Sequence, residues 1–247
     1  RILAAVGLAR MNSEPRLAFQ QLIPANIRRN VNISNVVFSI APKINAAGRI
    51  KHGSEAVHFM LSQDEEECKK YLNDINSLNN ERKLIDVDIT ESALQQLHKI
   101  NPNDNYSTIV YDPTWNKGVI GIVASRLVDM YYKPTIVFTQ NNEGEIVGSA
   151  RSVQGFDIHS AIAKNESLLT QYGGHMAAAG LAMKEENFEQ FKVDFDATVK
   201  EMSNGNFFTP FIEIDKEISF NDITKTFLEA VMRMSPFGPE NMNPVFL

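Results

Sequence analysis

Residues 134–152 read PTIVFTQNNEGEIVGSARS, and this stretch decides the fold class of the chain. A β-rich run at 134–139 leads into Asn-Asn-Glu-Gly at 141–144, a composition typical of a tight turn. A second β-rich run follows at 145–151. The stretch therefore predicts two strands joined by a turn.

The segments on either side continue this pattern in both directions. They comprise one expected strand and three expected helices, at 108–111, 118–130, 156–164 and 187–202. In the last of these helices Phe188, Phe191 and Phe195 recur at a helical spacing and should face inward. Alternating strands and helices indicate an α/β domain built on a mixed sheet.

The N-terminal part predicts helices. Residues 1–61 read as short helices with a loop at the NAAGR motif, 45–49, and a basic loop bracketed by Gly48 and Gly53. Ser62 and Glu65 form a capping box, and the first proline after it is Pro102, so one helix of roughly 35 residues should follow. A long and mostly polar helix often bridges two domains, with a coiled-coil arm as the alternative.

The expected organisation has four parts, divided where turn-forming residues gather, as at 101–105, NPNDN. These parts are a helical segment, a long connecting helix, an α/β domain and a linker into a further domain: 1–61, 62–101, 102–205 and 206–247. In the last part we expect a strand at 211–218, a helix at 222–234 and a first strand of the further domain at 244–247. Because residues 1–6, RILAAV, read as the middle of a helix, the chain should begin inside a larger protein.

The distribution of charge, the length of apolar runs and the cysteine content indicate which ligands and which compartment suit the protein. The net charge is −6, yet residues 1–51 carry eight basic side chains and one acidic one. This block can bind phosphate locally, unless the charges are scattered over solvated surface. No apolar run reaches the ~18 residues of a membrane span. The single cysteine, Cys68, suits a reducing cytoplasm and is expected to be a core or surface residue.

The stretch APKINAAGRI at 41–50 is the first candidate phosphate site. Its small residues allow a ligand to approach the backbone closely. Asn45 offers a donor and an acceptor, and Arg49 offers a planar fork that matches phosphate. The alternative is a tight turn with solvated basic side chains.

The end of the strand at 145–151 is the second candidate. Ser149 and Arg151 are two residues apart, so on a strand they point to the same face. A hydroxyl beside a guanidinium can clamp a phosphate. The alternative is an edge strand with an exposed arginine.

The stretch QYGGHMAAAG at 171–180 is the third candidate. Gly173 and Gly174 should precede a helix, whose N-terminus attracts anions, and His175 can donate to a phosphate oxygen. The alternative is a structural histidine. A fourth stretch, at 111–121, offers Tyr111 and Trp115 for stacking on a base, or for covering the edge of the core.

The sequence lacks the usual hydrolytic motifs. It contains no His-Glu-x-x-His, Cys-x-x-Cys, His-x-His, nucleophile elbow or Walker A loop. Asp86 and Asp88 lie in the long helix, face different sides and are expected to be solvated. We therefore predict no catalytic residue and no metal ligand in this chain.

Five stretches together resemble one family in their order. They are INAAGR at 44–49, WNKGVIGIVASR at 115–126, GSARS at 148–152, GGHMAAAG at 173–180 and PFGPENMNPVF at 236–246. These resemble signatures of the RecJ family of single-stranded-DNA exonucleases, within the DHH/DHHA1 superfamily. The second to fourth resemble its DHHA1 domain, and the fifth resembles the entry into its OB fold.

The resemblance implies a function for the intact protein. The family degrades single-stranded DNA from the 5′ end with Mn²⁺ or Mg²⁺, acting in DNA repair and recombination. Its metal ligands lie in an N-terminal DHH domain, whose Asp-His-His triplet is missing from this sequence. The chain is then expected to hold no metal and to be inactive alone. Residues 1–61 would be a remnant of the DHH domain, 102–205 the DHHA1 domain and 206–247 a linker with the start of a truncated OB fold.

The resemblance also assigns roles and partners. Asn45 and Arg49, with Ser149 and Arg151, would contact the DNA and its 5′ phosphate. Gly173, Gly174 and His175 would line the same groove. Partners would be single-stranded DNA with a 5′ end and, for the intact protein, a single-stranded-DNA-binding protein or a helicase.

Two other functions fit parts of the sequence. One is a phosphodiesterase of the same superfamily for oligoribonucleotides or cyclic dinucleotides. The other is a non-catalytic nucleic-acid-binding module, such as the DHHA1-like domains of alanyl-tRNA synthetases. The apparent OB-fold entry and the motif at 44–49 favour the DNA exonuclease, and the missing Cys and His patterns of a zinc site disfavour the synthetase type.

Overall fold

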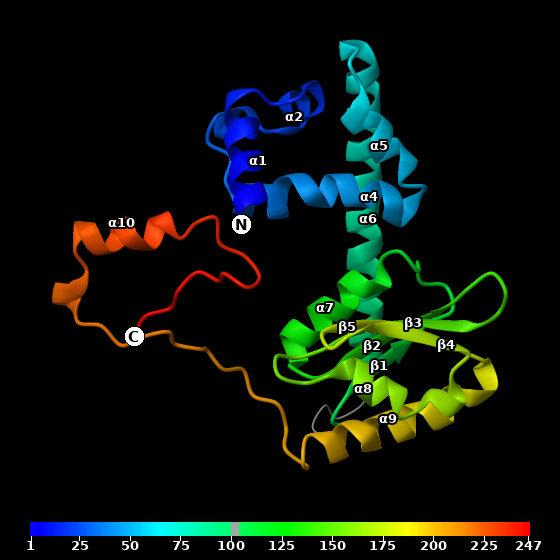
Figure 1. The fold of residues 1–247 in the computed structure, drawn as a ribbon. Coiled ribbons are helices and arrows are strands. Elements are labelled where there is room, and N and C mark those ends of the chain that lie inside the picture. Colours follow the sequence, from blue (N-terminus) through cyan, green and yellow to red (C-terminus); the bar gives the residue numbers. More distant parts are fainter. Residues whose placement is uncertain (100–103) are drawn as a thin grey trace. The chain divides into compact units, whose positions relative to one another are not determined.

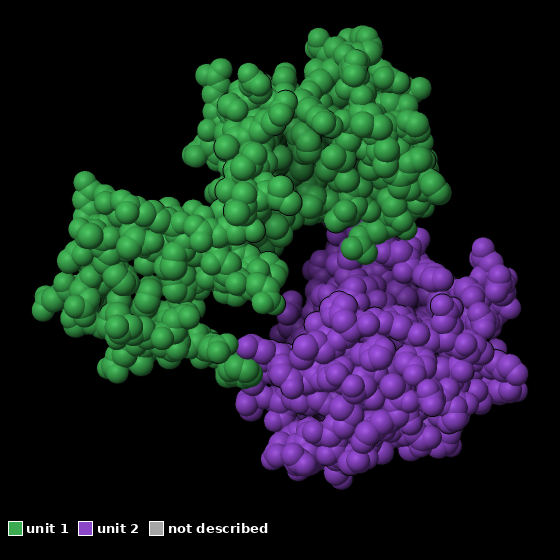
Figure 2. Space-filling view, viewed as in Figure 1, with its two compact units in different colours: residues 1–79, 211–247 green, residues 80–210 purple. Residues whose placement is uncertain are grey.

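A computed structural model of the chain describes residues 1–99 and 104–247. It contains two compact units, residues 1–79 with 211–247 and residues 80–210, which Figure 2 colours separately. The predicted boundary at 101–102 lies outside the described residues. Within the described part of the chain, no helix combines the length and the apolar composition needed to cross a membrane.

The second unit, 80–210, is built on a mixed five-stranded sheet, as predicted. The strand order is β1-β2-β3-β5-β4, in which β1 pairs with β2 in parallel and the other pairs are antiparallel. The strands are β1 (Thr108–Tyr111), β2 (Thr135–Gln140), β3 (Ile146–Arg151), β4 (Gln171–His175) and β5 (Ala178–Met183). The predicted hairpin at 134–152 is confirmed as β2 and β3, and Gly144 in its turn has a φ of +84°.

Helices cover the two faces of this sheet differently (Figure 1). Helices α8 (Ile158–Ala163) and α9 (Phe188–Met202) pack on one face, here called the closed face. Helix α7 (Ile120–Tyr131) packs on β2 and β3 at the opposite face, here called the open face. The three phenylalanines expected to face inward from α9 are buried in the closed-face core.

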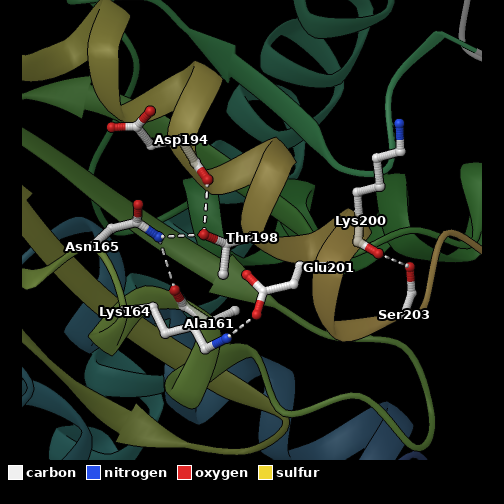
Figure 3. Close-up of polar contacts among 8 residues, drawn as sticks. All are labelled: Ala161, Lys164, Asn165, Asp194, Thr198, Lys200, Glu201 and Ser203. Carbon is white, nitrogen blue, oxygen red and sulfur yellow. Dashed lines mark hydrogen bonds and ion pairs between the residues drawn. The ribbon is translucent and has the colours of Figure 1, made fainter.

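Polar contacts join α8 to α9 on the closed face (Figure 3). The Asn165 side-chain amide donates to the Ala161 carbonyl at 3.0 Å and to the Thr198 hydroxyl at 3.2 Å. The Lys164 ammonium lies 2.9 Å from a Glu201 carboxylate oxygen. Because Asn165 and Thr198 are buried, their polar groups need these partners, and the two helices are held in one register.

The long predicted helix is confirmed as α6 (Glu65–Leu97), but its N-cap differs from the expected one. The Asp64 carboxylate, and not Ser62, accepts the backbone N–H of Glu67, at 2.8 Å. Ser62 instead ends α5 (Ser54–Leu61), since its own backbone N–H bonds back to His58 at 2.9 Å. A residue that closes one helix in this way is not placed to cap the next.

The prediction for Asp86 is wrong, because this carboxylate is buried with 2% exposure. Its Oδ2 lies 2.6 Å from Nη2 of Arg126 on α7 and 3.6 Å from Nη1 of Arg82. Helix α7 supplies this partner from 40 residues away in sequence, which spacing within α6 cannot reveal. Asp88 is exposed, as predicted.

Helix α6 also contacts the free side of strand β1. The Gln96 side-chain amide donates to the Tyr111 carbonyl at 3.0 Å, and its oxygen accepts the Tyr111 backbone N–H at 3.3 Å. Gln96 therefore satisfies both backbone groups of one residue on the outer strand.

The first unit is helical over residues 1–79. Its helices are α1 (Ile2–Ser13), α2 (Leu17–Leu22), α3 (Ile33–Asn35), α4 (Ala41–Ile50), α5 and the first part of α6. Their apolar faces meet in one cluster that includes Leu22, Ile40, Phe59 and Ile75. Cys68 is fully buried in that cluster, in keeping with a core residue.

The prediction of a loop at the NAAGR motif, 45–49, is wrong, because these residues lie within α4, Ala41–Ile50. Pro42 stands in its first turn, where a missing N–H costs nothing, and Ala46 and Ala47 are fully buried. The two alanines therefore serve helix packing.

Residues 211–247 contain α10 (Lys225–Arg233), begun by Thr224, whose hydroxyl accepts the Phe227 N–H at 3.2 Å. The strand expected at 211–218 does not form as a regular element. Only short backbone pairing joins 215–218 to 245–247, with Asp215 N–H to Val245 oxygen and Ile218 N–H to Leu247 oxygen, both at 2.9 Å.

Candidate functional site

Strand pairing brings the second and third candidate stretches together on the open face. Ser149 of β3 is paired with Gly180 of β5, which is paired with Gly173 of β4. Directly paired residues share a face of the sheet, and neighbouring strands lie ~4.8 Å apart. Ser149 and Gly173 therefore belong to one row, with their Cα atoms roughly 10 Å apart.

A second row lies next to the first. Arg151 is paired with Ala178, and Ala178 with His175. Alternation along each strand puts this row on the same face as the first one. Arg151 is partly exposed, and His175 is exposed. Four predicted site residues, Ser149, Arg151, Gly173 and His175, are therefore neighbours on the open face.

The Arg151 side chain lies against its own strand. Its Nη1 donates to the Ser149 hydroxyl at 3.1 Å and to the Ala150 carbonyl at 2.8 Å. Gly121, in the first turn of α7, lies against the same guanidinium. A guanidinium gains nothing from the positive end of a helix, whereas an anion between them is attracted by both. The electrostatics of this corner therefore favour an anionic ligand.

The prediction of a helix after Gly173 and Gly174 is wrong, because residues 171–183 form the β4–β5 hairpin. Alternate residues of β5 face the closed-face core, namely Ala179, Leu181 and Met183. Burial at every second position requires a strand. Residues 171–183 therefore supply no helix N-terminus of their own to bind an anion.

Gly174 has a backbone role in this hairpin. Its φ is +151°, and a Cβ there would lie 2.3 Å from the Ala178 carbonyl oxygen. By alternation it faces away from Gly173, so it does not belong to the open-face rows. His175 accepts the Ala177 backbone N–H through Nδ1 at 3.3 Å, which orients its ring at the turn.

A hollow of about 530 Å³ adjoins the first row of the open face. Gly173 and Gly180 contribute to its lining, with Lys117, Glu145 and Gln171 around them. Glycines at this place leave the backbone accessible to a ligand. The lining carries the positive charge of Lys117, which the sequence reasoning did not single out although it lies in the quoted motif at 115–126, and the negative charges of Glu143 and Glu145.

The aromatic residues at 111–121 cover the core. Trp115 has 7% exposure, and its carbonyl accepts the Thr139 hydroxyl at 2.6 Å. Tyr111 packs on Phe188 with ring centroids 4.9 Å apart, and burial, followed by the charges of Glu185 and Asp112, raises its pKa. The core interpretation is confirmed for Trp115, which is not accessible to a base.

Asn45 and Arg49 of the first candidate belong to the other unit. They stand four residues apart in α4, so they share one face of that helix. Asn45 is exposed and Arg49 is partly exposed.

Residues 1–99 and 104–247 contain no group of three or more His, Cys, Asp or Glu side chains that could hold a metal ion. The donor sets of these residues therefore do not fit a divalent ion, and we assign no hydrolytic step to them.

Sequence reasoning missed Gly121 and Asp86. Gly121 had one available signal, a glycine in the first turn of a predicted helix, where alanine is favoured. Asp86 had none, since its partner Arg126 comes from another helix.

We compared the chain with models of known protein families and with curated proteins. The DHHA1 domain model matches residues 103–201, and the RecJ OB domain model matches residues 214–247. The single-stranded-DNA-specific exonuclease RecJ of Bacillus subtilis (strain 168) is 33% identical over 99% of this chain and 31% of that protein. The corresponding Haemophilus influenzae protein is 30% identical over 100% of this chain and 44% of that protein. The chain thus spans less than half the length of either relative.

Solved structures agree with the sequence comparisons. The crystal structure of RecJ from Thermus thermophilus in complex with Mn²⁺ matches with a TM-score of 0.82 at 26% identity, over 99% of this chain and 36% of that one. The Mg²⁺ complex matches with a TM-score of 0.79 at 27% identity, over 97% and 37%. This chain is therefore similar to RecJ exonucleases over 99% of its length, with a match to the DHHA1 domain at residues 103–201 and to the RecJ OB domain at residues 214–247.

Proposed function

We propose that this chain is the DNA-binding portion of a 5′→3′ single-stranded-DNA exonuclease, and that the open face of its sheet binds the 5′-terminal phosphate. The observation that supports this is the pair of adjoining rows that brings Ser149, Arg151, Gly173 and His175 to one face. Relatives named as single-stranded-DNA-specific exonucleases supply the reaction class.

Each member of the rows has a role in holding the phosphate. The Arg151 guanidinium supplies the charge and a planar set of donors, and the Ser149 hydroxyl beside it supplies a further donor. Gly173 allows the sugar-phosphate backbone to approach the sheet closely. His175, at the far end of the second row, donates to the same strand of DNA.

Asn45 and Arg49 also contact DNA, through α4. An amide and a guanidinium on one helix face are suited to a phosphate and a neighbouring sugar or base edge. Gly174 supports the site indirectly, because it permits the turn that positions His175.

The remaining parts of the proposal concern the intact protein. Residues 1–61 belong to a DHH domain, 62–101 connect it to a DHHA1 domain at 102–205, and 206–247 lead into an OB fold. A divalent ion, Mn²⁺ or Mg²⁺, acts in the DHH domain through ligands that residues 1–61 do not contain, so this chain alone binds DNA without cleaving it. The protein works in DNA repair and recombination in the cytoplasm, with a single-stranded-DNA-binding protein or a helicase as partner.

Fluorescence anisotropy with short single strands, with and without a 5′ phosphate, tests the proposal. We expect the chain to prefer the phosphorylated strand. Arg151→Ala should remove that preference with a loss of about ten-fold or more, since hydrogen bonds to a charged group contribute about 1.5–3 kcal/mol each.

Lys192→Ala is a matched control. It also removes one positive charge, but from α9, which covers the closed face. It should leave the preference intact. Equal binding of the two strands by the unaltered chain, or a full preference in Arg151→Ala, would contradict the proposal. Competition by a cyclic dinucleotide as strong as that by the phosphorylated strand would favour the small-nucleotide phosphodiesterase.

A further inference from the structure

Gly121 is a glycine in a place where the backbone does not require one. It is the second residue of α7 and is buried. It does not belong to the glycines with positive φ among the described residues. Glycine destabilises a helix relative to alanine, because it loses more backbone freedom on folding. A reason other than backbone conformation must therefore account for it.

The reason is that the space next to the Gly121 Cα, where a Cβ would lie, is already occupied. A Cβ built on Gly121 would lie 2.9 Å from both Nη2 of Arg151 and Oγ of Ser149, and 3.7 Å from Cζ of Arg151. Real Cβ atoms essentially never approach other heavy atoms this closely. The volume that a side chain would fill is already occupied by the two groups of the phosphate clamp.

We propose that Gly121 is a positioning residue for this clamp, an inference that rests on the proposed function. The missing side chain leaves a slot between α7 and β3 in which the Arg151 guanidinium lies against the Ser149 hydroxyl. A guanidinium held in this way before the ligand arrives loses less conformational freedom on binding. The slot also keeps the positive charge of Arg151 beside the first turn of α7, where the guanidinium and the helix dipole both attract an anion.

The atoms that alanine would displace are the ends of two side chains and not backbone. The guanidinium can swing away and the hydroxyl can change rotamer while β3 and α7 stay in place. Gly121→Ala should therefore move the clamp and preserve the fold. This separates the inference from an ordinary packing role, in which substitution lowers stability first.

The experiment measures unfolding and DNA binding of Gly121→Ala in the full chain. We expect an unfolding midpoint that is unchanged or raised, because alanine favours the helix. Affinity for a 5′-phosphorylated single strand should fall about five-fold or more, while affinity for the 5′-hydroxyl strand stays the same. Gly7→Ala is the control, since Gly7 is also a helical glycine and has no atom within 4 Å of an added Cβ.

A double mutant separates positioning from other causes. In the Arg151→Ala background, Gly121→Ala should weaken binding of the phosphorylated strand less than it does in the wild type, because the guanidinium is gone and only the Ser149 hydroxyl is left to displace. Additive losses would overturn the inference. So would a full phosphate preference in Gly121→Ala, provided that Arg151→Ala abolishes that preference. A wild-type chain without any preference would instead overturn the proposed function.

A measurement on the wild-type chain covers the case in which Gly121→Ala does not fold. The slot predicts that the Arg151 guanidinium is ordered without ligand. Its ¹⁵N relaxation, with the signal identified through Arg151→Lys, should show order close to that of the backbone. A guanidinium that moves freely in the absence of DNA would overturn the inference.

Discussion

The two faces of the five-stranded sheet differ although the same strands build both. On the closed face, β3 and β5 bury large apolar side chains under α8 and α9, including Ile146, Leu181 and Met183. On the open face, the candidate site residues are small or polar: Ser149 and Arg151 are partly exposed, and Gly173, His175 and Gly180 are exposed. The difference teaches that alternation along a strand can separate stability from binding, so that a substitution on one face should leave the other property unchanged.

The largest loss of folding stability is expected from a substitution on the closed face. Phe191→Ala removes a fully buried ring that packs on Phe138 and Phe195, and should lower the free energy of unfolding by about 3–5 kcal/mol. Urea denaturation measures this. His175→Ala, on the open face, should stay within about 0.5 kcal/mol of the wild type. Similar losses in both variants would break the distinction between the faces.

Two adjacent glycines of β4 give a sharper comparison. Gly174→Ala should destabilise the chain by about 2–3 kcal/mol, since its φ of +151° is strained for alanine and the Cβ would meet a carbonyl oxygen. Gly173→Ala should change stability little, because an added Cβ meets no atom within 4 Å. Thermal unfolding of the two variants is the test, and equal midpoints would count against the backbone role of Gly174.

Breaking the ion pair that attaches α7 to α6 should lower the free energy of unfolding by an intermediate amount. Asp86→Asn leaves Arg126 and Arg82 without their buried counter-charge, at a cost of about 1–2 kcal/mol. The cost stays below that of a fully buried pair because the Arg126 side chain is 49% exposed and can be rehydrated. Asp88→Asn, at an exposed position of the same helix, is the control. Equal unfolding free energies of the two variants would show that the pair contributes nothing.

The smallest effect on folding stability is expected at Asp157, the N-cap of α8, a helix that helps to cover the closed face. The pKa of Asp157 is lowered first by the backbone N–H of Ser160 and next by its hydroxyl. A lowered folded-state pKa means that the ionised cap stabilises the fold above the ordinary carboxyl pKa, and that this contribution is lost as the pH falls through the folded-state pKa.

Asp157→Asn keeps a good N-cap and should match the wild type within about 0.5 kcal/mol near neutral pH. Below pH ~4 the wild type should lose more stability than the variant, because only the wild type gains a proton there. Urea denaturation at several pH values measures the difference. Parallel pH profiles would rule out a contribution from the ionised cap.

The elements that were predicted well from the sequence have a clear local signal. Strands β2 and β3 are β-rich runs on either side of the turn at 141–144, and α9 has phenylalanines at a helical spacing, so the bounds of these elements shifted by one residue only. The stretch 177–180, Ala-Ala-Ala-Gly, offers no such signal, and its strand character depends on burial that only tertiary structure supplies.

The candidate site was predicted in part for the same reason. Residues two apart on a strand share a face by geometry, which placed Ser149 beside Arg151 correctly. Contacts between distant elements leave no local signal. Gly121 meets the clamp only because α7 packs on β3, and Asp86 is buried only because α7 also packs on α6.

The contact of Gln96 with Tyr111 bears on how the chain avoids aggregation. An outer strand presents unpaired peptide groups to which another molecule can add a strand. Gln96 bonds both the N–H and the carbonyl of Tyr111, and so imitates a single residue of a further strand. A strand from a second molecule would have to displace this amide from α6 before it could pair at Tyr111. The long helix thus acts as a steric and hydrogen-bonding guard against intermolecular sheet growth from β1.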